Sequence, residues 1–149
     1  VRIGGPRGLG AGRGAGVDIG STGAEVGQDG GVTGRNASVA GVADRVEVET
    51  GARRALPFPD ATFDLVVSSL AIHNIRSNED RRRAITEGFR VLTPGGRMVI
   101  ADIRATAIYE EALRALGASQ VQRRRLGWRF WWGNPIAGTT LLTASKQPL

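Results

Sequence analysis

The sequence contains no cysteine, a single lysine and no long apolar run. The absence of cysteine excludes disulfide bonds, thiolate metal sites and cysteine nucleophiles. No apolar segment approaches the roughly 18–20 residues that a membrane-spanning helix needs, and the first ten residues lack the apolar core of a signal peptide. These absences predict a cytoplasmic protein with no metal site and no membrane span.

Basic residues outnumber acidic ones, and nearly all of them are arginine. The 149 residues include 20 Lys and Arg against 14 Asp and Glu, a net charge of +6, and Lys146 is the only lysine. Such an excess can favour nucleic acid. The densest clusters are residues 81–83 and 123–125, and Glu79 and Asp80 can pair locally with the first of these. We therefore expect two solvated faces and no nucleic-acid partner.

Residues 1–36 differ from the rest of the chain in composition. They hold 13 of the 22 glycines and few large apolar side chains. Such a stretch cannot bury enough surface to offset its backbone entropy. Only GVDI, residues 16–19, has the pattern of a short buried strand. The sequence predicts a poorly ordered glycine-rich segment at 1–36 and an α/β domain at 37–149.

Beyond residue 36, strand patterns alternate with helix patterns. Strands are predicted at 45–50 (RVEVET), 63–70 (FDLVVSSL), 97–103 (RMVIADI), 119–132 and 138–145. The apolar run at 63–70 is typical of a strand covered on both faces. Helices are predicted from Ser77 or Asn78 to about Leu92, ended by TPGG at 93–96, and over 108–116, ended by Gly117. The last two strands share a short turn and should pair antiparallel.

The order of these segments resembles a known family. GVDI, ETGARRALPFPDATFDLVVSS, VLTPGGRMVIAD and the WRFWW segment follow one another as in class I S-adenosylmethionine-dependent methyltransferases, in the branch grouped with ubiquinone and menaquinone biosynthesis. The resemblance runs from about residue 16 to residue 146. It implies an open Rossmann-like α/β fold, with a mostly parallel sheet and a C-terminal antiparallel hairpin, and methyl transfer from S-adenosylmethionine to a small-molecule acceptor.

The resemblance also implies cofactor-binding positions on the first part of the chain. Asp18, followed by Ile19, matches the acidic residue that accepts hydrogen bonds from the ribose hydroxyls; taken alone, it could equally cap a turn. Ala52 and Arg53 occupy the positions that face the adenine, where the family usually has an aspartate. A guanidinium only donates, so Arg53 cannot bind the adenine amino group as that aspartate does.

A second group of cofactor-binding positions follows the strand at 63–70. Ser68, Ser69 and Leu70 match the segment whose backbone faces the methionine part of the cofactor, and His73 lies on the same rim. His73 is either a general base or a residue bonded to a loop carbonyl at the start of a helix. A base requires a proton of the acceptor within reach, whereas a nucleophile that is already deprotonated needs mainly alignment.

The glycines of RGLGAGRGAGVDIG, residues 7–20, imitate a cofactor loop but have the wrong spacing. From Gly8 to Asp18 there are ten residues, whereas a loop, a helix and a strand place the acid roughly 20 residues on. We therefore expect these glycines to lead into the second strand of the family's sheet. The first strand, which is central in that sheet, would then lie outside this chain or be lost. This expectation predicts an N-terminally incomplete fold of marginal stability.

Two features leave alternatives open. Alternation puts Trp128, Phe130 and Trp132 on one strand face, which predicts packing against a core helix, while Trp131 would face a substrate mouth. An incomplete site leaves open a catalytically inactive remnant that acts as a partner-binding module.

Overall fold

The computed structural model divides the chain into two compact units, residues 1–57 and 58–149. Each unit is considered by itself. The structure describes residues 12, 14–18, 35, 38–39, 41, 43–50, 55–130 and 138–148. Within this described part, no helix is both long and apolar enough to cross a bilayer.

The first unit contains a two-stranded parallel sheet. Strand β1 (Gly14–Asp18) pairs with β2 (Val46–Thr50), in a register that places Asp18 opposite Thr50. A short 3₁₀ turn, η1 (Ala43–Arg45), precedes β2. The strand predicted at 16–19 corresponds to β1, which begins two residues earlier. Because β1 and β2 are parallel, Asp18 and Thr50 end the two strands at the same edge.

The second unit contains a four-stranded sheet with the order β3-β4-β6-β5. Its strands are β3 (Phe63–Ser69), β4 (Leu92–Asp102), β5 (Ser119–Arg125) and β6 (Thr140–Ser145). β3 and β4 are parallel, while β6 runs antiparallel to both β4 and β5. The α/β class and the antiparallel pairing of the last two strands are therefore confirmed.

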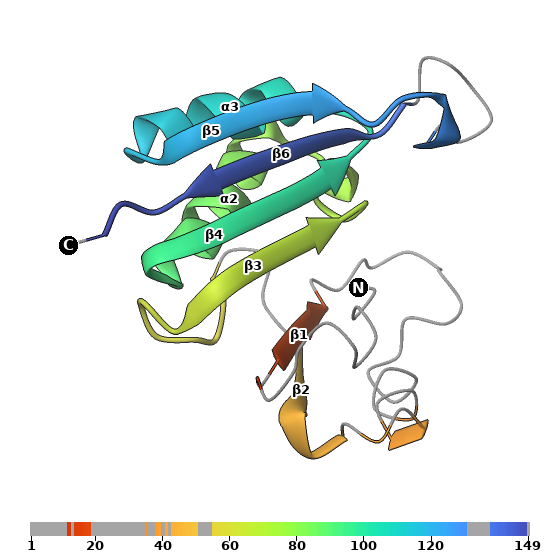
Figure 1. The fold of residues 1–149 in the computed structure, drawn as a ribbon, viewed down its shortest axis with the longest axis vertical. Coiled ribbons are helices and arrows are strands. Elements are labelled where there is room, and N and C mark those ends of the chain that lie inside the picture. The colour runs from red at the N-terminus through yellow and green to blue at the C-terminus, as the bar shows by residue number, and fades with distance from the viewer. Residues whose placement is uncertain are drawn as a thin grey trace. The chain divides into compact units, whose positions relative to one another are not determined.

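Two helices cover one face of this sheet (Figure 1). They are α2 (Asn78–Arg90) and α3 (Thr106–Ala115). The Ser77 side chain caps α2 by accepting a hydrogen bond from the Asp80 N–H at 2.9 Å, as the sequence predicts. Gly117, with φ of +76°, follows the end of α3.

The core lies between these helices and the sheet. Its buried apolar side chains are Ile85, Phe89, Val91, Leu92, Met98, Ile100, Tyr109, Ala112, Leu113, Leu142 and Ala144. Burial of one large apolar side chain stabilises a fold by roughly 1.5–3 kcal/mol. Alternate residues of β4 and β6 form the sheet side of this core.

Two predictions about the strands are wrong. β3 is not covered on both faces, because Leu65 and Val67 are 53% and 59% exposed. β3 is an edge of the four-stranded sheet, and α2 and α3 lie on one face only. The strand predicted at 119–132 ends at Arg125 instead.

The chain leaves β5 through Gly127, which has φ of +79°, into the 3₁₀ turn η3 (Trp128–Phe130). Trp128 and Phe130 are 69% and 52% exposed, so they do not pack against a core helix. Trp131 and Trp132 lie outside the described residues. The aromatic side chains of this segment favour a strand, but the chain turns at Gly127, whose positive φ is incompatible with a continued strand.

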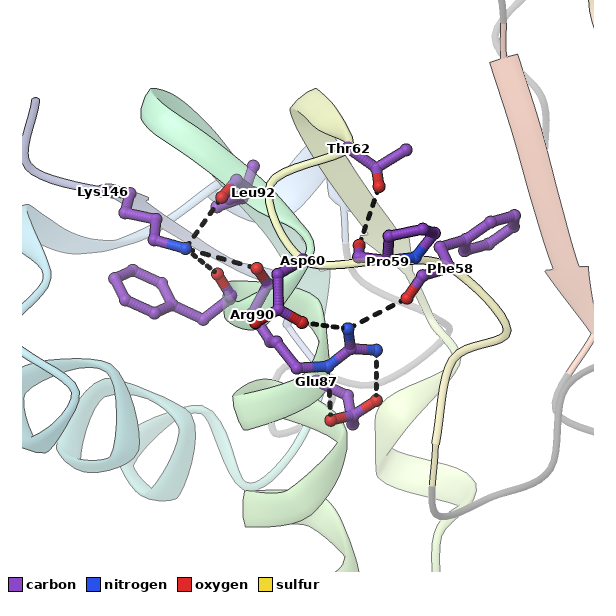
Figure 2. Close-up of polar contacts among 9 residues, drawn as sticks. Phe58, Pro59, Asp60, Thr62, Glu87, Arg90, Leu92 and Lys146 are labelled. Atoms are coloured by element: carbon purple, nitrogen blue, oxygen red, sulfur yellow. Dashed lines mark hydrogen bonds and ion pairs between the residues drawn. The ribbon is translucent and has the colours of Figure 1, made fainter.

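The amino end of β3 is fixed by polar contacts to the end of α2 (Figure 2). The Arg90 guanidinium donates to both carboxylate oxygens of Glu87 at 2.9 Å, to the Phe58 carbonyl at 2.9 Å and to Asp60 at 2.6 Å. The Lys146 ammonium donates to the carbonyls of Phe89, Arg90 and Leu92. These contacts at the amino end of β3 therefore stabilise the fold. The candidate site lies at the opposite end, where β3 and β4 both finish.

Candidate functional site

Two parallel strands end side by side at the opposite edge of the second unit. In the β3–β4 register, Ser68 lies opposite Ile100 and Ser69 opposite Ala101. The Leu70 N–H continues the pairing by donating to the Ala101 carbonyl at 2.9 Å. Leu70 then turns the chain with φ of +53°, a left-handed conformation that is uncommon for a leucine. Strained positions of this kind occur often at functional sites.

His73 and Asp102 meet at this edge. His73 lies in the 3₁₀ turn η2 (Ile72–Asn74) after β3, and Asp102 is the last residue of β4. The His73 Nδ1 lies 2.5 Å from Asp102 Oδ1, and the His73 backbone N–H donates to Oδ2 at 3.1 Å. A carboxylate only accepts, so in the neutral imidazole Nδ1 carries the proton and Nε2 presents a lone pair.

The Asp102 carboxylate is fully buried and has further donors. The Ile103 N–H donates to Oδ1 at 2.8 Å, and the Tyr109 hydroxyl of α3 lies 3.4 Å from Oδ2. These donors offset much of the cost of burying a charge. Arg81 of α2 donates to the His73 backbone carbonyl at 3.1 Å, so α2 contacts the turn that carries the imidazole and α3 contacts the carboxylate that binds it.

Burial raises the pKa of the Tyr109 hydroxyl, and the negative charge of Asp102 raises it further, while Arg81 lowers it. The phenol is therefore neutral across the physiological range and remains a hydrogen-bond donor. The His73 side chain is 12% exposed and Asp102 is not exposed at all. A partly accessible imidazole held by a buried carboxylate is an arrangement that can accept a proton from a ligand.

The structure brings together four of the eight predicted cofactor-binding residues. Ser68, Ser69, Leu70 and His73 all lie at the carboxyl edge of β3. Asp18 is the last residue of β1 in the first unit. Ile19, Ala52 and Arg53 lie outside the described residues.

Asp102 is the site residue that the sequence did not single out. The sequence left two interpretations of His73, a general base or a residue bonded to a loop carbonyl. The second is wrong for Nδ1, because its partner is the Asp102 carboxylate. A signal was available: an aspartate ends the buried strand VIAD and a histidine follows the preceding strand. Parallel neighbours end at the same edge, so the two side chains could have been expected to meet.

Comparison with known proteins supports the family resemblance. The family described as methyltransferase domain matches residues 9–100. The ubiquinone/menaquinone biosynthesis C-methyltransferase UbiE of Roseobacter denitrificans is 42% identical over 68 residues, which cover 46% of this chain and 26% of that protein. The chain thus spans about a quarter of the length of this curated relative.

Solved structures show the fold. The [4+2]-cyclase SpnF is 19% identical with a TM-score of 0.68, covering 93% of this chain and 68% of that one. The N-methyltransferase NodS of Bradyrhizobium japonicum, in complex with S-adenosyl-L-homocysteine, is 15% identical with a TM-score of 0.64, covering 90% and 66%. One of these two is named a cyclase, so the fold alone does not determine the reaction.

The family match extends over more than half of the chain, and its segment order agrees with the observed strands and helices. The chain therefore belongs to the methyltransferase domain family and has the Rossmann-like fold of class I S-adenosylmethionine-dependent methyltransferases.

Proposed function

We propose that this protein transfers a methyl group from S-adenosylmethionine to a small-molecule acceptor, with His73 as the general base. Membership of the family supports methyl transfer. The observation that carries the role of His73 is its hydrogen bond to the buried Asp102 at the carboxyl edge of two parallel strands. Open sheets of this kind bind their ligands beyond that edge.

The residues at the strand ends fit the cofactor. Ser69 is exposed and Ser68 half-buried, and their hydroxyls both donate and accept, which suits the charged amino-acid end of S-adenosylmethionine. Asp18 at the end of β1 would accept hydrogen bonds from the ribose hydroxyls. When bound, S-adenosylmethionine supplies a methyl group on a positively charged sulfur.

His73 would take up the proton that the acceptor loses. As an oxygen or nitrogen of the acceptor bonds to the methyl carbon, the methyl–sulfur bond would break with its electron pair left on the neutral thioether, and the O–H or N–H proton of the acceptor would pass to His73 Nε2. Asp102 keeps the imidazole in the required tautomer and stabilises the resulting positive charge. Tyr109 and Arg81 also face this pair, and both are donors in the observed contacts.

The test measures methyl transfer from isotopically labelled S-adenosylmethionine to a set of small phenolic and amine acceptors. We expect His73→Gln to lower kcat by about 10²–10⁴-fold. Cofactor binding, measured by calorimetry, should be unchanged in this variant. A variant with the wild-type rate would contradict the role of His73.

Calorimetric titration of the wild type with S-adenosylmethionine decides between an enzyme and the partner-binding alternative. A functional cofactor site should give measurable heat with S-adenosylmethionine. An absence of heat at millimolar ligand would overturn the proposed function and leave a domain without methyl transfer.

A further inference from the structure

A cavity of about 460 Å³ opens in the second unit, at the end of the sheet where β4 ends and β6 begins. It is lined by residues 103–107 after β4, by Arg123, Arg124 and Arg125 at the end of β5, and by Thr140 at the start of β6. The Ile103 N–H, in this lining, donates to the Asp102 carboxylate. The strand pairing places both Asp102 and Arg125 opposite Thr140. The cavity and the candidate base therefore share one edge of the sheet.

The lining is strongly basic. Four of its side chains are arginines, Arg104 together with the three of β5, and none of its residues is acidic. Arg123 donates to Glu110 at 2.7 Å. The pKa of Glu110 is lowered by its hydrogen bond with Arg114 and by the charge of Arg123, so this carboxylate is ionised. In the described part of the chain, Arg104, Arg124 and Arg125 have no acidic partner.

The first turn of α3 faces the same cavity. Thr106 and Ala107, which begin α3, belong to the lining. The capping residue Ala105 has no side-chain acceptor and a left-handed φ of +60°, and the first turn contains no acidic residue. The Ile108 N–H already donates to the Ala105 carbonyl at 2.9 Å, so the Thr106 and Ala107 N–H groups and the positive end of the helix dipole are left for an external acceptor. Helix N-termini of this kind commonly bind phosphate.

We propose that this cavity binds the phosphate or diphosphate group of a small-molecule methyl acceptor, a specificity that rests on the proposed function. Arg123 and Arg125 share the face of β5 that pairs with the buried Leu142 and with Thr140, whereas Arg124 lies on the other face. Arg104 and Arg125, which have no acidic partner in the described part of the chain, match a ligand with more than one negative charge. The volume lies within the range of small-molecule sites and leaves room for part of the organic group. A concave site closed by a helix terminus favours a terminal phosphate over the extended backbone of a nucleic acid.

The test titrates the full chain with inorganic pyrophosphate by calorimetry at physiological salt, without S-adenosylmethionine. The variant pair Arg104→Gln and Arg125→Gln should weaken binding at least tenfold. The control pair Arg83→Gln and Arg97→Gln removes the same charge from exposed positions outside the cavity and should change binding less than twofold. Equal losses in the two pairs would show a response to net charge and overturn the proposal.

Two further ligands test whether the cavity prefers phosphate to another anion and to a nucleic acid. Citrate, a trianion without phosphorus, should bind at least tenfold more weakly than pyrophosphate, and equal binding would overturn the commitment to phosphate. A short single-stranded RNA that binds more tightly than pyrophosphate and depends on Arg104 and Arg125 would overturn it in favour of a nucleic-acid surface. Pyrophosphate binding with no heat from S-adenosylmethionine would uphold the phosphate cavity and refute the methyl transfer separately.

Discussion

Lys146 ties the C-terminal segment to the end of α2. Its ammonium donates to three carbonyl oxygens, at 3.2 Å to Phe89, 3.3 Å to Arg90 and 2.8 Å to Leu92 (Figure 2). It also lies 5.4 Å from the centroid of the Phe89 ring. Carbonyls at a helix C-terminus have no partner within the helix, and a cation there opposes the negative end of the dipole. The one lysine of the chain thus acts as a helix cap.

Replacement of this lysine should destabilise the fold. We expect Lys146→Met to lower the free energy of unfolding by about 1–3 kcal/mol, since it removes charged hydrogen bonds and leaves carbonyls unpaired. Urea denaturation measures the effect as a lower midpoint at unchanged slope. Gln147→Met, at the exposed neighbouring position, is the control and should stay within about 0.5 kcal/mol of the wild type. Equal midpoints for the two variants would remove the capping role.

Tyr109 should make the fold sensitive to alkaline pH. Burial and the nearby Asp102 raise its pKa in the folded state. A raised pKa favours the protonated phenol in the folded protein, so this stability is complete below the unfolded pKa of about 10 and is lost as pH rises above it. The loss is at most about 1.4 kcal/mol per pH unit.

The variant Tyr109→Phe isolates this contribution. Its free energy of unfolding should lie within about 1 kcal/mol of the wild type at pH 8, because the lost hydrogen bond is long. Above about pH 10 the difference should shift in favour of the variant. Tyr109 is the only tyrosine, so tyrosinate absorbance follows its ionisation directly. Parallel stability curves for the two proteins up to high pH would contradict the raised pKa.

Most of the helices and central strands could be predicted from the sequence because local signals specify them, but TPGG at 93–96, predicted to end α2, lies within β4. Ser77 caps α2, Gly117 follows α3, and alternate residues of β4 face the core. The turn after β5 could not be predicted, because hydrogen bonds between residues distant in the sequence stabilise it. The Leu126 N–H donates to the Thr139 carbonyl, and the Thr139 N–H donates to the Phe130 carbonyl. The His73–Asp102 pair is similar: its partners are 29 residues apart, and only the β3–β4 register brings them together.

Contact between α2 and the sheet depends on the small residue Gly88. A Cβ atom at Gly88 would lie 2.7 Å from the Met98 Cε and 3.6 Å from a methyl group of Val66. We expect Gly88→Val to lower the free energy of unfolding by about 1–3 kcal/mol through overpacking. Thr86→Val, on the exposed side of α2, is the control and should change it by about 0.5 kcal/mol or less.

A double-mutant cycle identifies the neighbour that causes this strain. Met98→Ala should cost less in the Gly88→Val background than in the wild type, because the shortened side chain vacates the space that valine needs. Additive effects of the two substitutions would show that Met98 is not the obstacle.

The described residues form a two-stranded sheet in the first unit and a four-stranded sheet in the second, and the candidate cofactor residues fall in both units. The sequence predicted a strand at or near each of these positions, whereas its expectation of marginal stability for the chain stays a prediction. Cofactor binding offers a measure of this stability, because a ligand that binds only the folded protein stabilises it in proportion to the logarithm of its concentration.

S-adenosylmethionine at 100 times its Kd should stabilise the chain by about 2.7 kcal/mol, which corresponds to a rise in Tm of roughly 5–10 °C for this size. Asp18→Asn should reduce this rise, because an amide replaces the carboxylate that would accept from the ribose hydroxyls. Asp44→Asn removes the same charge at an exposed position of the same unit and should leave the rise unchanged. Adenosine, which carries the ribose without the amino-acid end, should show the same ranking of variants with smaller shifts. An equal rise in both variants would exclude Asp18 from the cofactor site and leave the ribose contact to another residue.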